Sequence, residues 1–204
     1  MLLTLHPENP NPRDLKQVVQ ILNNQGIIIL PTDTIYAMAC RLDNKKGIER
    51  MSRIAGKKPD KIDFSLICSD LSNISEFAAG MDKSVFRLLK NNLPGPFTFI
   101  LNANTRLSRF FNTNKTTVGI RVPDNPIAQT LIHELGIPLV VTTIHHDNTI
   151  AEYMTDPEEI HDKFQYLVDC VIDGGAGRNV PSTIIDCTGD EPIIKRQGAG
   201  VIDE

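Results

Sequence analysis

The chain has 204 residues, of which 41% are hydrophobic and 23% are charged, and its formal net charge is −4. A folded chain of this size buries roughly 70% of its unfolded surface, which is enough for a hydrophobic core without metal or disulfide support. These proportions exclude disordered, collagen-like and coiled-coil proteins and favour a single domain over residues 1–204.

The first predicted helix has clear start and stop signals. Asn11 can cap its N-terminus, Pro12 suits its first position, and Gly26 follows its end. Apolar residues recur at helical spacing between these signals. The segment that follows, residues 26–31, is a continuous apolar run ending at Pro31, and it predicts a buried strand.

Helical and extended patterns alternate through the rest of the chain. The predicted helices are residues 45–55, 70–77, 82–91, 126–135 and 157–164. The predicted strands are residues 64–68, 97–101, 117–123, 139–143, 167–172, 182–186 and 193–196. Because strands and helices alternate with short connections, we expect an α/β domain whose twisted mixed sheet is flanked by helices.

Charge is distributed unevenly along the chain. Residues 1–122 contain 17 basic and 10 acidic residues, a net charge of +7, whereas residues 123–204 contain 4 and 15, a net charge of −11. The densest basic stretch is residues 41–61, with a net charge of +5. Such asymmetry favours a phosphate or polyanion partner on one face, although a solvated basic helix would have the same composition.

The cysteine pattern and the N-terminus bear on the compartment. The four cysteines are far apart and form no Cys-x-x-Cys pair, which is typical of reduced thiols in a cytoplasmic protein. The first residues lack the basic region and cleavage site of a secretory signal, and no apolar run reaches the roughly 18 residues of a membrane helix. A zinc site of the cysteines with His145 and His146 stays open, but the spacing gives it no support. Adjacent histidines on a loop are more often solvated, so we predict no metal site.

Polar and basic side chains gather where the predicted strands and the basic helix begin or end. Ligands of open α/β sheets bind beyond strand ends, so these side chains are candidates for a site. Lysine and arginine neutralise phosphate charge, and hydroxyl groups fix orientation, which favours polyphosphate binding. The candidates are Thr32, Asp33, Thr34, Tyr36, Lys57, Lys58, Lys61, Thr117, Arg121, Thr142, Thr143, Ser182, Thr183 and Arg196.

Other kinds of site have less support. The candidates include no Ser-His-Asp or Cys-His arrangement with recognisable spacing, which disfavours covalent catalysis. There is no Walker loop, and the glycine-rich residues 174–177 lack the helical context of a dinucleotide fingerprint, so they are more typical of a turn. Two simpler interpretations stay open, because threonine is frequent in strands and Arg121 could pair with a surface acid.

Seven segments form an ordered set across nearly the whole chain. They are IIILPTDTIY at 27–36, LPGPFTFIL at 93–101, VGIRVPDNP at 118–126, GIPL at 136–139, IDGG at 172–175, STIID at 182–186 and RQG at 196–198. In this order and spacing the segments resemble the YrdC/YciO family. The resemblance implies one domain with a twisted mixed sheet, flanking helices and a concave, positively charged cleft.

The resemblance also implies a function. Family members make threonylcarbamoyl-AMP from L-threonine, bicarbonate and ATP with Mg²⁺, releasing pyrophosphate, and the product feeds N6-threonylcarbamoyladenosine modification of tRNA. By position, Thr34, Arg121 and Ser182 would bind threonine. The nucleotide would meet Lys57, Lys61, Thr117, Thr143 and Arg196, of which Lys57, Lys61 and Arg196 would stabilise charge in the reaction.

Two departures from the family pattern shift the resemblance toward its YciO branch. The Lys-x-Arg motif is absent, and Lys57, Lys58 and Lys61 stand in its region, although lysine cannot replace a bidentate arginine fully. The Ser-Ala-Asn motif reads Thr143-Ile-His. Residues 64–72 and 90–95 also resemble that branch. The alternative is therefore a YciO-type protein that binds nucleotide, tRNA or double-stranded RNA without synthesis, or that acts on the adenylate in the reverse or hydrolytic direction.

Overall fold

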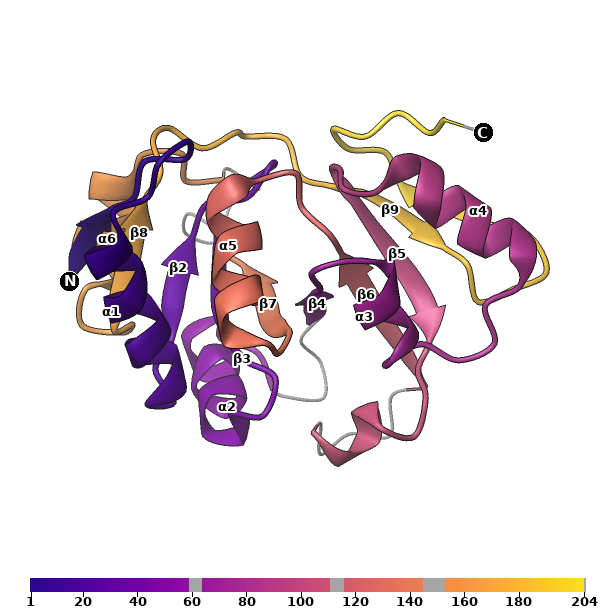
Figure 1. Ribbon diagram of the computed structural model, residues 1–204, viewed down its shortest axis with the longest axis horizontal. Coiled ribbons are helices and arrows are strands. Elements are labelled where there is room, and N and C mark those ends of the chain that lie inside the picture. Colours follow the sequence, from indigo (N-terminus) through magenta and orange to yellow (C-terminus); the bar gives the residue numbers. More distant parts are fainter. Residues whose placement is uncertain (59–63, 111–115, 145–152, 204) are drawn as a thin grey trace.

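The computed structural model describes residues 1–58, 64–110, 116–144 and 153–203. Within these ranges the strands form one mixed sheet in the order β1-β8-β2-β3-β7-β4-β6-β5-β9-β10 (Figure 1). The strands are β1 (Leu2–Thr4), β2 (Ile28–Leu30), β3 (Ala37–Arg41), β4 (Ser65–Ile67), β5 (Phe97–Asn102), β6 (Thr117–Arg121), β7 (Leu139–Thr143), β8 (Cys170–Asp173), β9 (Thr183–Asp186) and β10 (Ile193–Arg196). The helices are α1 (Pro12–Asn23), α2 (Lys45–Ile54), α3 (Leu71–Ser75), α4 (Lys83–Asn92), α5 (Pro126–Leu135), α6 (Pro157–Phe164) and the 3-10 turn η1 (Leu107–Arg109). The predicted α/β fold is confirmed.

The centre of the sheet differs from the prediction in one strand. β3 was not predicted, yet it pairs antiparallel with both β2 and β7, so it lies in the middle of the sheet. Its residues AMACR include no β-branched or aromatic side chain, which is why the sequence carries no strand signal. β1 was not predicted either, because three residues at the sheet edge, paired with β8, are too short to show a period.

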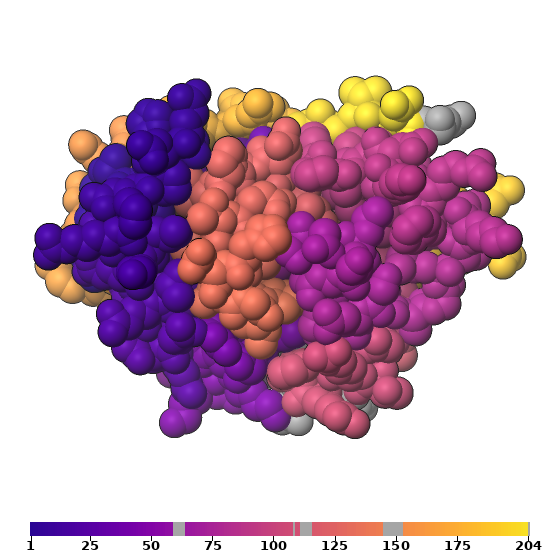
Figure 2. Space-filling model, viewed as in Figure 1, coloured from indigo at the N-terminus to yellow at the C-terminus, as the bar shows by residue number. Residues whose placement is uncertain are grey.

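Helices cover both faces of the sheet. α1 and α5 lie side by side over one face and hide the strands behind them in Figure 2. Their apolar residues pack with alternate residues of β2, β3 and β7, whereas apolar residues of α2, α3, α4 and α6 belong to a second cluster with the other alternate residues. β2 shows the division. Ile28 and Leu30 belong to the first cluster, whereas Ile29 and the preceding residue Ile27 belong to the second. The continuous apolar run is therefore explained by burial on both faces.

Capping residues hold α1 and α5 in place, and the cap predicted at Asn11 is confirmed. The Asn11 side chain accepts a hydrogen bond from the Arg13 amide at 3.0 Å. Asn125 accepts one from the Ala128 amide, also at 3.0 Å, and Gly136 ends α5 with a φ of 64°. Four residues thus separate the end of β6 from the start of α5, which fixes the chain that follows Arg121.

The cysteines are buried as free thiols. Burial raises the pKa of Cys40 to about 12 and those of Cys170 and Cys187 to about 11, so the thiols stay protonated at neutral pH. In the described part of the chain no group of three or more histidine, cysteine, aspartate or glutamate residues could hold a metal ion. No helix of the described residues is both long and apolar enough to cross a membrane.

Candidate functional site

The loop between β2 and β3 is shaped by its own threonines. Thr32 Oγ1 donates a hydrogen bond to the Ile35 carbonyl at 2.8 Å and accepts one from the Thr34 amide at 3.1 Å. The two hydroxyl oxygens of Thr32 and Thr34 also lie 3.1 Å apart. Thr34 is completely buried, so its hydroxyl is a fixed feature of this loop and not a surface group.

Arg121, the last residue of β6, reaches into this loop. Its Nη2 donates to Asp33 Oδ1 at 2.8 Å and to Thr34 Oγ1 at 2.9 Å. The other oxygen of Asp33 accepts from the Asp124 amide at 3.2 Å. The side chains of Arg121 and Asp33 are each only 7% exposed. Arg121 therefore pairs with an acid as the simpler interpretation had it, but the pair is buried and not on the surface.

The Arg121 guanidinium has an N–H donor that the described residues leave unpaired. Its Nε is buried and has no hydrogen-bond partner among the described residues. Burial lowers the pKa of Arg121, Asp33 opposes this effect, and the positive charge of Arg196 adds to it. A buried donor without an acceptor is costly, and such groups are rare in folded proteins. The geometry therefore suits a ligand that brings an acceptor oxygen.

Ser182 and Arg196 form a second pair of polar contacts close to Arg121. Ser182 Oγ lies 2.7 Å from Thr98 Oγ1 in a buried position. The Ser182 carbonyl accepts from Nη2 of Arg196 at 2.8 Å and from its Nε at 3.3 Å. The register of β9 and β10 shifts between Ile194 and Arg196, and this bulge redirects the strand at the arginine. Arg196 itself is exposed.

The structure brings some of the predicted site residues together and leaves others apart. We call the residues joined by these contacts and charges the arginine cluster: Asp33, Thr34, Arg121, Ser182 and Arg196. Lys57 is exposed after α2, Thr117 is exposed at the start of β6, and Thr143 is half-buried opposite Ala37. No contact among the described residues joins these three to the arginine cluster. Lys61, His145 and His146 lie outside the described residues.

Distance along β6 separates Thr117 from the arginine cluster. Four residues of an extended strand span roughly 13 Å, so a ligand that touched both Thr117 and Arg121 would be larger than an amino acid. A site that used both Thr117 and Arg121 would therefore suit an extended molecule such as a nucleotide.

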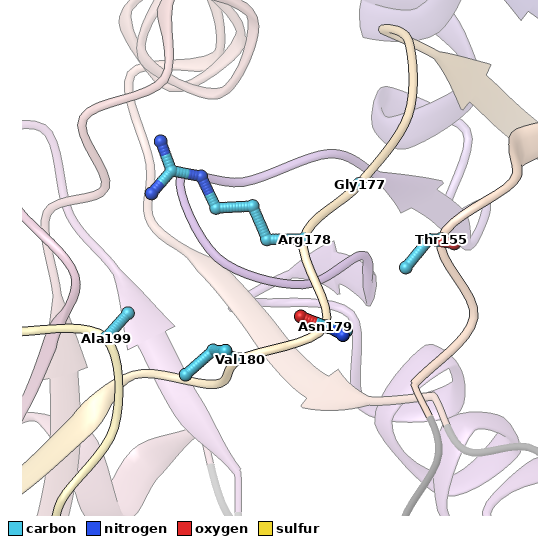
Figure 3. A pocket seen from close by; sticks show the side chains of 6 residues that line it. All are labelled: Thr155, Gly177, Arg178, Asn179, Val180 and Ala199. Atoms are coloured by element: carbon cyan, nitrogen blue, oxygen red, sulfur yellow. The ribbon is translucent and has the colours of Figure 1, made fainter.

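A cavity of about 460 Å³ lies beside the β2–β3 loop (Figure 3). The Arg178 amide donates to the Thr34 carbonyl at 3.0 Å, which attaches the cavity wall to the arginine cluster. The residues that line it are Thr155, Gly177, Arg178, Asn179, Val180 and Ala199.

Sequence reasoning gave no role to three residues of this region. Asp33 was noted only as a carboxylate between threonines, and its burial opposite Arg121 could not be read from the sequence. Thr98 carried a signal, because it points to the side of β5 opposite to Phe97 and Phe99, but a hydroxyl in a strand is ordinary. Arg178 lies in the acidic half of the chain and in an irregular segment, and no pattern marked it.

The chemistry of the arginine cluster is that of an anion site. The cluster contains two guanidinium groups and one carboxylate, and it includes the hydroxyls of Thr34 and Ser182. The cluster therefore carries a positive surplus, which suits a carboxylate or phosphate ligand. Among the described residues its only carboxylate, Asp33, is already bonded to Arg121, so the cluster contains no free base for proton abstraction.

Comparison with known proteins gives consistent matches along the chain. The family model Sua5_yciO_yrdC, described by the words telomere recombination, matches residues 20–198. The uncharacterized protein YciO of Escherichia coli (strain K12) is 41% identical over 198 residues, which are 96% of this chain and 94% of that protein. The crystal structure of E. coli YciO superimposes with a TM-score of 0.90 at 40% identity and covers 98% of this chain and 97% of its own.

Two further matches carry names that refer to threonine. A threonylcarbamoyl-AMP synthase of Vibrio vulnificus (strain YJ016) is 29% identical over 188 residues, which are 91% of this chain and 98% of that protein. The crystal structure of P. abyssi Sua5 complexed with L-threonine has the same fold, with a TM-score of 0.87 at 22% identity. That match covers 97% of this chain and 57% of the Sua5 chain.

Proposed function

Since the chain belongs to the Sua5/YciO/YrdC family, we propose that it makes threonylcarbamoyl-AMP and pyrophosphate from L-threonine, bicarbonate and ATP. The product would serve the N6-threonylcarbamoyladenosine modification of tRNA. Family members that carry the synthase name, such as the Vibrio protein, match 91% of the chain, which supports an enzymatic role.

The observation that carries the proposal is the buried Arg121 with its unpartnered Nε next to Thr34. An amino-acid carboxylate would supply the missing acceptor and form a charge-assisted hydrogen bond. The hydroxyls of Thr34 and Ser182 would orient the rest of the threonine molecule. The presence of L-threonine in the Sua5 crystal structure is consistent with this assignment.

ATP would extend away from the threonine pocket along the exposed cations. Arg196 stands next to Ser182 and would meet the phosphate nearest the threonine. Lys57 and Lys61 would neutralise the remaining phosphates, and the hydroxyls of Thr117 and Thr143 would contact the nucleotide. Exposed cations suit this role because they bind polyphosphate without first losing a buried partner.

The chemistry needs positioning and charge stabilisation from the protein. The threonine amine and bicarbonate give a carbamate and water. A carbamate oxygen then attacks the α-phosphorus, the bond from that phosphorus to the bridging oxygen breaks, and pyrophosphate leaves with the bridging oxygen. This chain would accelerate the step in two ways. It would hold the two reactants together, and it would place Lys57, Lys61 and Arg196 around the negative charge that develops.

A protein-held Mg²⁺ does not fit the arginine cluster. Magnesium prefers carboxylate oxygens, and the one carboxylate of the arginine cluster already accepts hydrogen bonds from Arg121 and from the Asp124 amide. Mg²⁺ therefore enters the proposal only as the counterion that accompanies ATP. We assign it no residue and no part in the step above.

Mass spectrometry of a reaction mixture tests the proposal. The protein would be incubated with ATP, Mg²⁺, L-threonine and bicarbonate, beside a known synthase as a positive control. We expect threonylcarbamoyl-AMP and pyrophosphate that depend on both threonine and bicarbonate. Arg121→Gln should abolish the product, and Arg87→Gln, which changes an exposed arginine of α4, should not. No product from a protein that remains folded, with the control active, would contradict the proposal.

A second candidate function rests on the YciO similarity and on the changed motifs. The 41% identity is to an uncharacterized YciO protein, and Thr143-Ile-His stands in place of the family's Ser-Ala-Asn. The same site would then bind nucleotide without synthesis, hydrolyse the pre-made adenylate, or hold RNA along the exposed lysines of α2. Two assays distinguish these outcomes: hydrolysis of the pre-made adenylate, and binding of a double-stranded RNA, each added separately to the protein. RNA binding would weaken steeply with salt.

A further inference from the structure

The segment that joins β8 to β9 is fastened to the β2–β3 loop at several points. We call residues 174–180 the strap. Tyr36 Oη donates to the Gly175 carbonyl at 2.7 Å and accepts from the Gly174 amide at 3.2 Å. The Gly177 amide donates to the Thr155 carbonyl at 2.7 Å. Together with the bond from the Arg178 amide to the Thr34 carbonyl, these contacts fix the strap along its length.

The glycines of the strap allow this close approach. A Cβ on Gly177 would lie 2.7 Å from Cδ2 of the Tyr36 ring, and a Cβ on Gly174 would lie 2.7 Å from Cγ of Pro31. Gly175 has a φ of 91°, which other residues rarely adopt. The strap therefore lies so close to Tyr36 and Pro31 that a side chain at Gly177 or Gly174 would clash with them.

Tyr36 is itself buried, with 1% of its surface exposed. Its hydroxyl makes both hydrogen bonds to the strap and is the polar end of an otherwise apolar contact. A buried tyrosine hydroxyl normally finds such a partner, and here both partners belong to the same two-residue piece of the strap. This hydroxyl is therefore one of the groups that hold the strap in place.

The strap contains Arg178, whose side chain forms no polar contact with the described residues. Arg178 is exposed, and its guanidinium has no hydrogen-bond or ion-pair partner among the described residues. Figure 3 shows its side chain extending from the strap past the β2–β3 loop, while Asn179 and Val180 line the cavity. Its backbone is bonded to Thr34, the residue whose hydroxyl accepts from Arg121.

We propose that Arg178 is a phosphate-binding residue of the substrate site and that Tyr36 is the positioning residue that holds it there. This proposal rests on the proposed function, because it names a further ligand of the same nucleotide. Asp33 offsets the charge of Arg121, but no carboxylate of the described residues is paired with Arg178 or Arg196. A ligand that neutralises both needs at least two negative charges, which a polyphosphate has and an amino-acid carboxylate lacks.

Residues 178–182 provide further support for a polyphosphate ligand. Arg178 is the first residue of this segment, and Arg196 donates to the carbonyl of Ser182, its last residue. The Ala199 amide donates to the Pro181 carbonyl at 2.9 Å, so the chain after β10 closes the far side of the cavity. Residues 178–182 therefore connect the cavity wall to the carbonyl that Arg196 contacts.

Binding by calorimetry tests both parts of the proposal. The probes are Mg-ATP, adenosine and tripolyphosphate, and the variants are Arg178→Gln, Arg178→Lys, Tyr36→Phe and the Arg178→Gln/Tyr36→Phe double variant, with Arg87→Gln as the matched control. We expect Arg178→Gln to weaken ATP and tripolyphosphate binding by about ten- to a hundredfold, because a hydrogen bond to a charged group is lost. Adenosine binding should change less than threefold. Arg178→Lys should restore part of the loss.

The role of Tyr36 is tested by non-additivity. Tyr36→Phe should weaken ATP binding several-fold in the wild-type background and have no further effect when Arg178 is already glutamine. An equal effect of Tyr36→Phe in both backgrounds would show that Tyr36 acts on binding independently of Arg178, and would overturn its positioning role. A thermal melt of each variant confirms that the affinities are those of folded protein.

The outcomes separate this proposal from the proposed function. If the wild type makes threonylcarbamoyl-AMP and Arg178→Gln binds ATP as tightly as it does, the phosphate role of Arg178 is wrong and the proposed function stands. If the wild type makes no product but binds tripolyphosphate in an Arg178-dependent way, the proposed function is wrong and the phosphate role stands. A wild type that binds neither ATP nor tripolyphosphate overturns both.

Discussion

The arginine cluster and the exposed lysines after α2 are two basic regions built on opposite principles. Arg121 is 6% exposed, and its charge is balanced by Asp33 and bonded to Thr34. Lys57 is exposed, and its side chain has no hydrogen bond or ion pair with the described residues. In the first region the fold itself requires the charges to be arranged before any ligand arrives. In the second region the charges stay hydrated until a ligand orders them.

This difference follows from the cost of burial. A buried guanidinium without a partner is strongly destabilising, so Arg121 can exist only with Asp33 beside it. An exposed lysine gives up little hydration and little rotamer freedom to remain unpaired. We therefore expect substitutions in the buried region to affect folding and binding together, and substitutions in the exposed region to affect binding alone.

The largest expected effect is from Arg121→Met, which leaves the Asp33 carboxylate buried and unpaired. We expect it to lower the free energy of unfolding by about 3–5 kcal/mol. Urea unfolding followed by circular dichroism would measure the loss, and Arg87→Met on exposed α4 is the matched control. A loss no larger than that of the control would mean that Asp33 and Arg121 are less buried in solution than they are here.

A double variant sharpens the same prediction. Arg121→Met combined with Asp33→Leu removes both charges, so most of the lost stability should return because apolar groups can replace a buried ion pair. Ligand binding should not return, since the guanidinium is gone. Recovery of both properties would remove Arg121 from the candidate site.

Much of the fold could be predicted from the sequence because most elements carry their own signals. The caps at Asn11 and Asn125, the glycine after α5 and the continuous apolar run of β2 all have local physical causes. β3 has no such cause. Its alanine, methionine and cysteine residues become a central strand only because β2 and β7 present free backbone groups on both sides.

The candidate site divides in the same way. The sequence could indicate that Thr34, Arg121, Ser182 and Arg196 gather near strand ends, because strand ends are where open sheets bind ligands. It could not indicate that Asp33 would neutralise Arg121 or that the strap would place Arg178 beside Thr34. Both facts depend on how two loops fold against each other, and no period or spacing within either loop encodes that contact.

Ser182 belongs to the arginine cluster but contributes no charge, and Ser182→Ala should have an intermediate effect. The substitution leaves Thr98 Oγ1 buried without its partner, which lowers the free energy of unfolding by about 1–2 kcal/mol. The bond from Arg196 goes to the backbone carbonyl and should persist. Ser75→Ala, at an exposed hydroxyl of α3, is the control for the same urea experiment. If both variants lose equal stability, the Thr98 contact is not a buried one.

Alkaline pH tests how firmly the strap contact is buried. Burial raises the pKa of Tyr36 from 10 to about 12, so the fold favours the neutral phenol. The stabilising contribution is complete below pH 10 and is lost as the pH rises toward 12. Melting temperatures between pH 9 and 12 should therefore fall less steeply in Tyr36→Phe than in the wild type. Tyr166→Phe, at a tyrosine that is 90% exposed, should leave the slope unchanged.

The smallest effect on stability is expected from Lys57→Gln, and this variant sets the limit of the comparison. Because the side chain is exposed and has no hydrogen bond or ion pair with the described residues, the free energy of unfolding should change by less than about 0.5 kcal/mol. Its contribution to ATP binding should nonetheless be measurable and should fade between 50 mM and 500 mM salt, since exposed charges are screened within a Debye length. Threonine binding at the buried Arg121 should change far less over that range. If salt weakened both ligands equally, the two basic regions would be one electrostatic surface, and the distinction between preformed and ligand-ordered charge would be wrong.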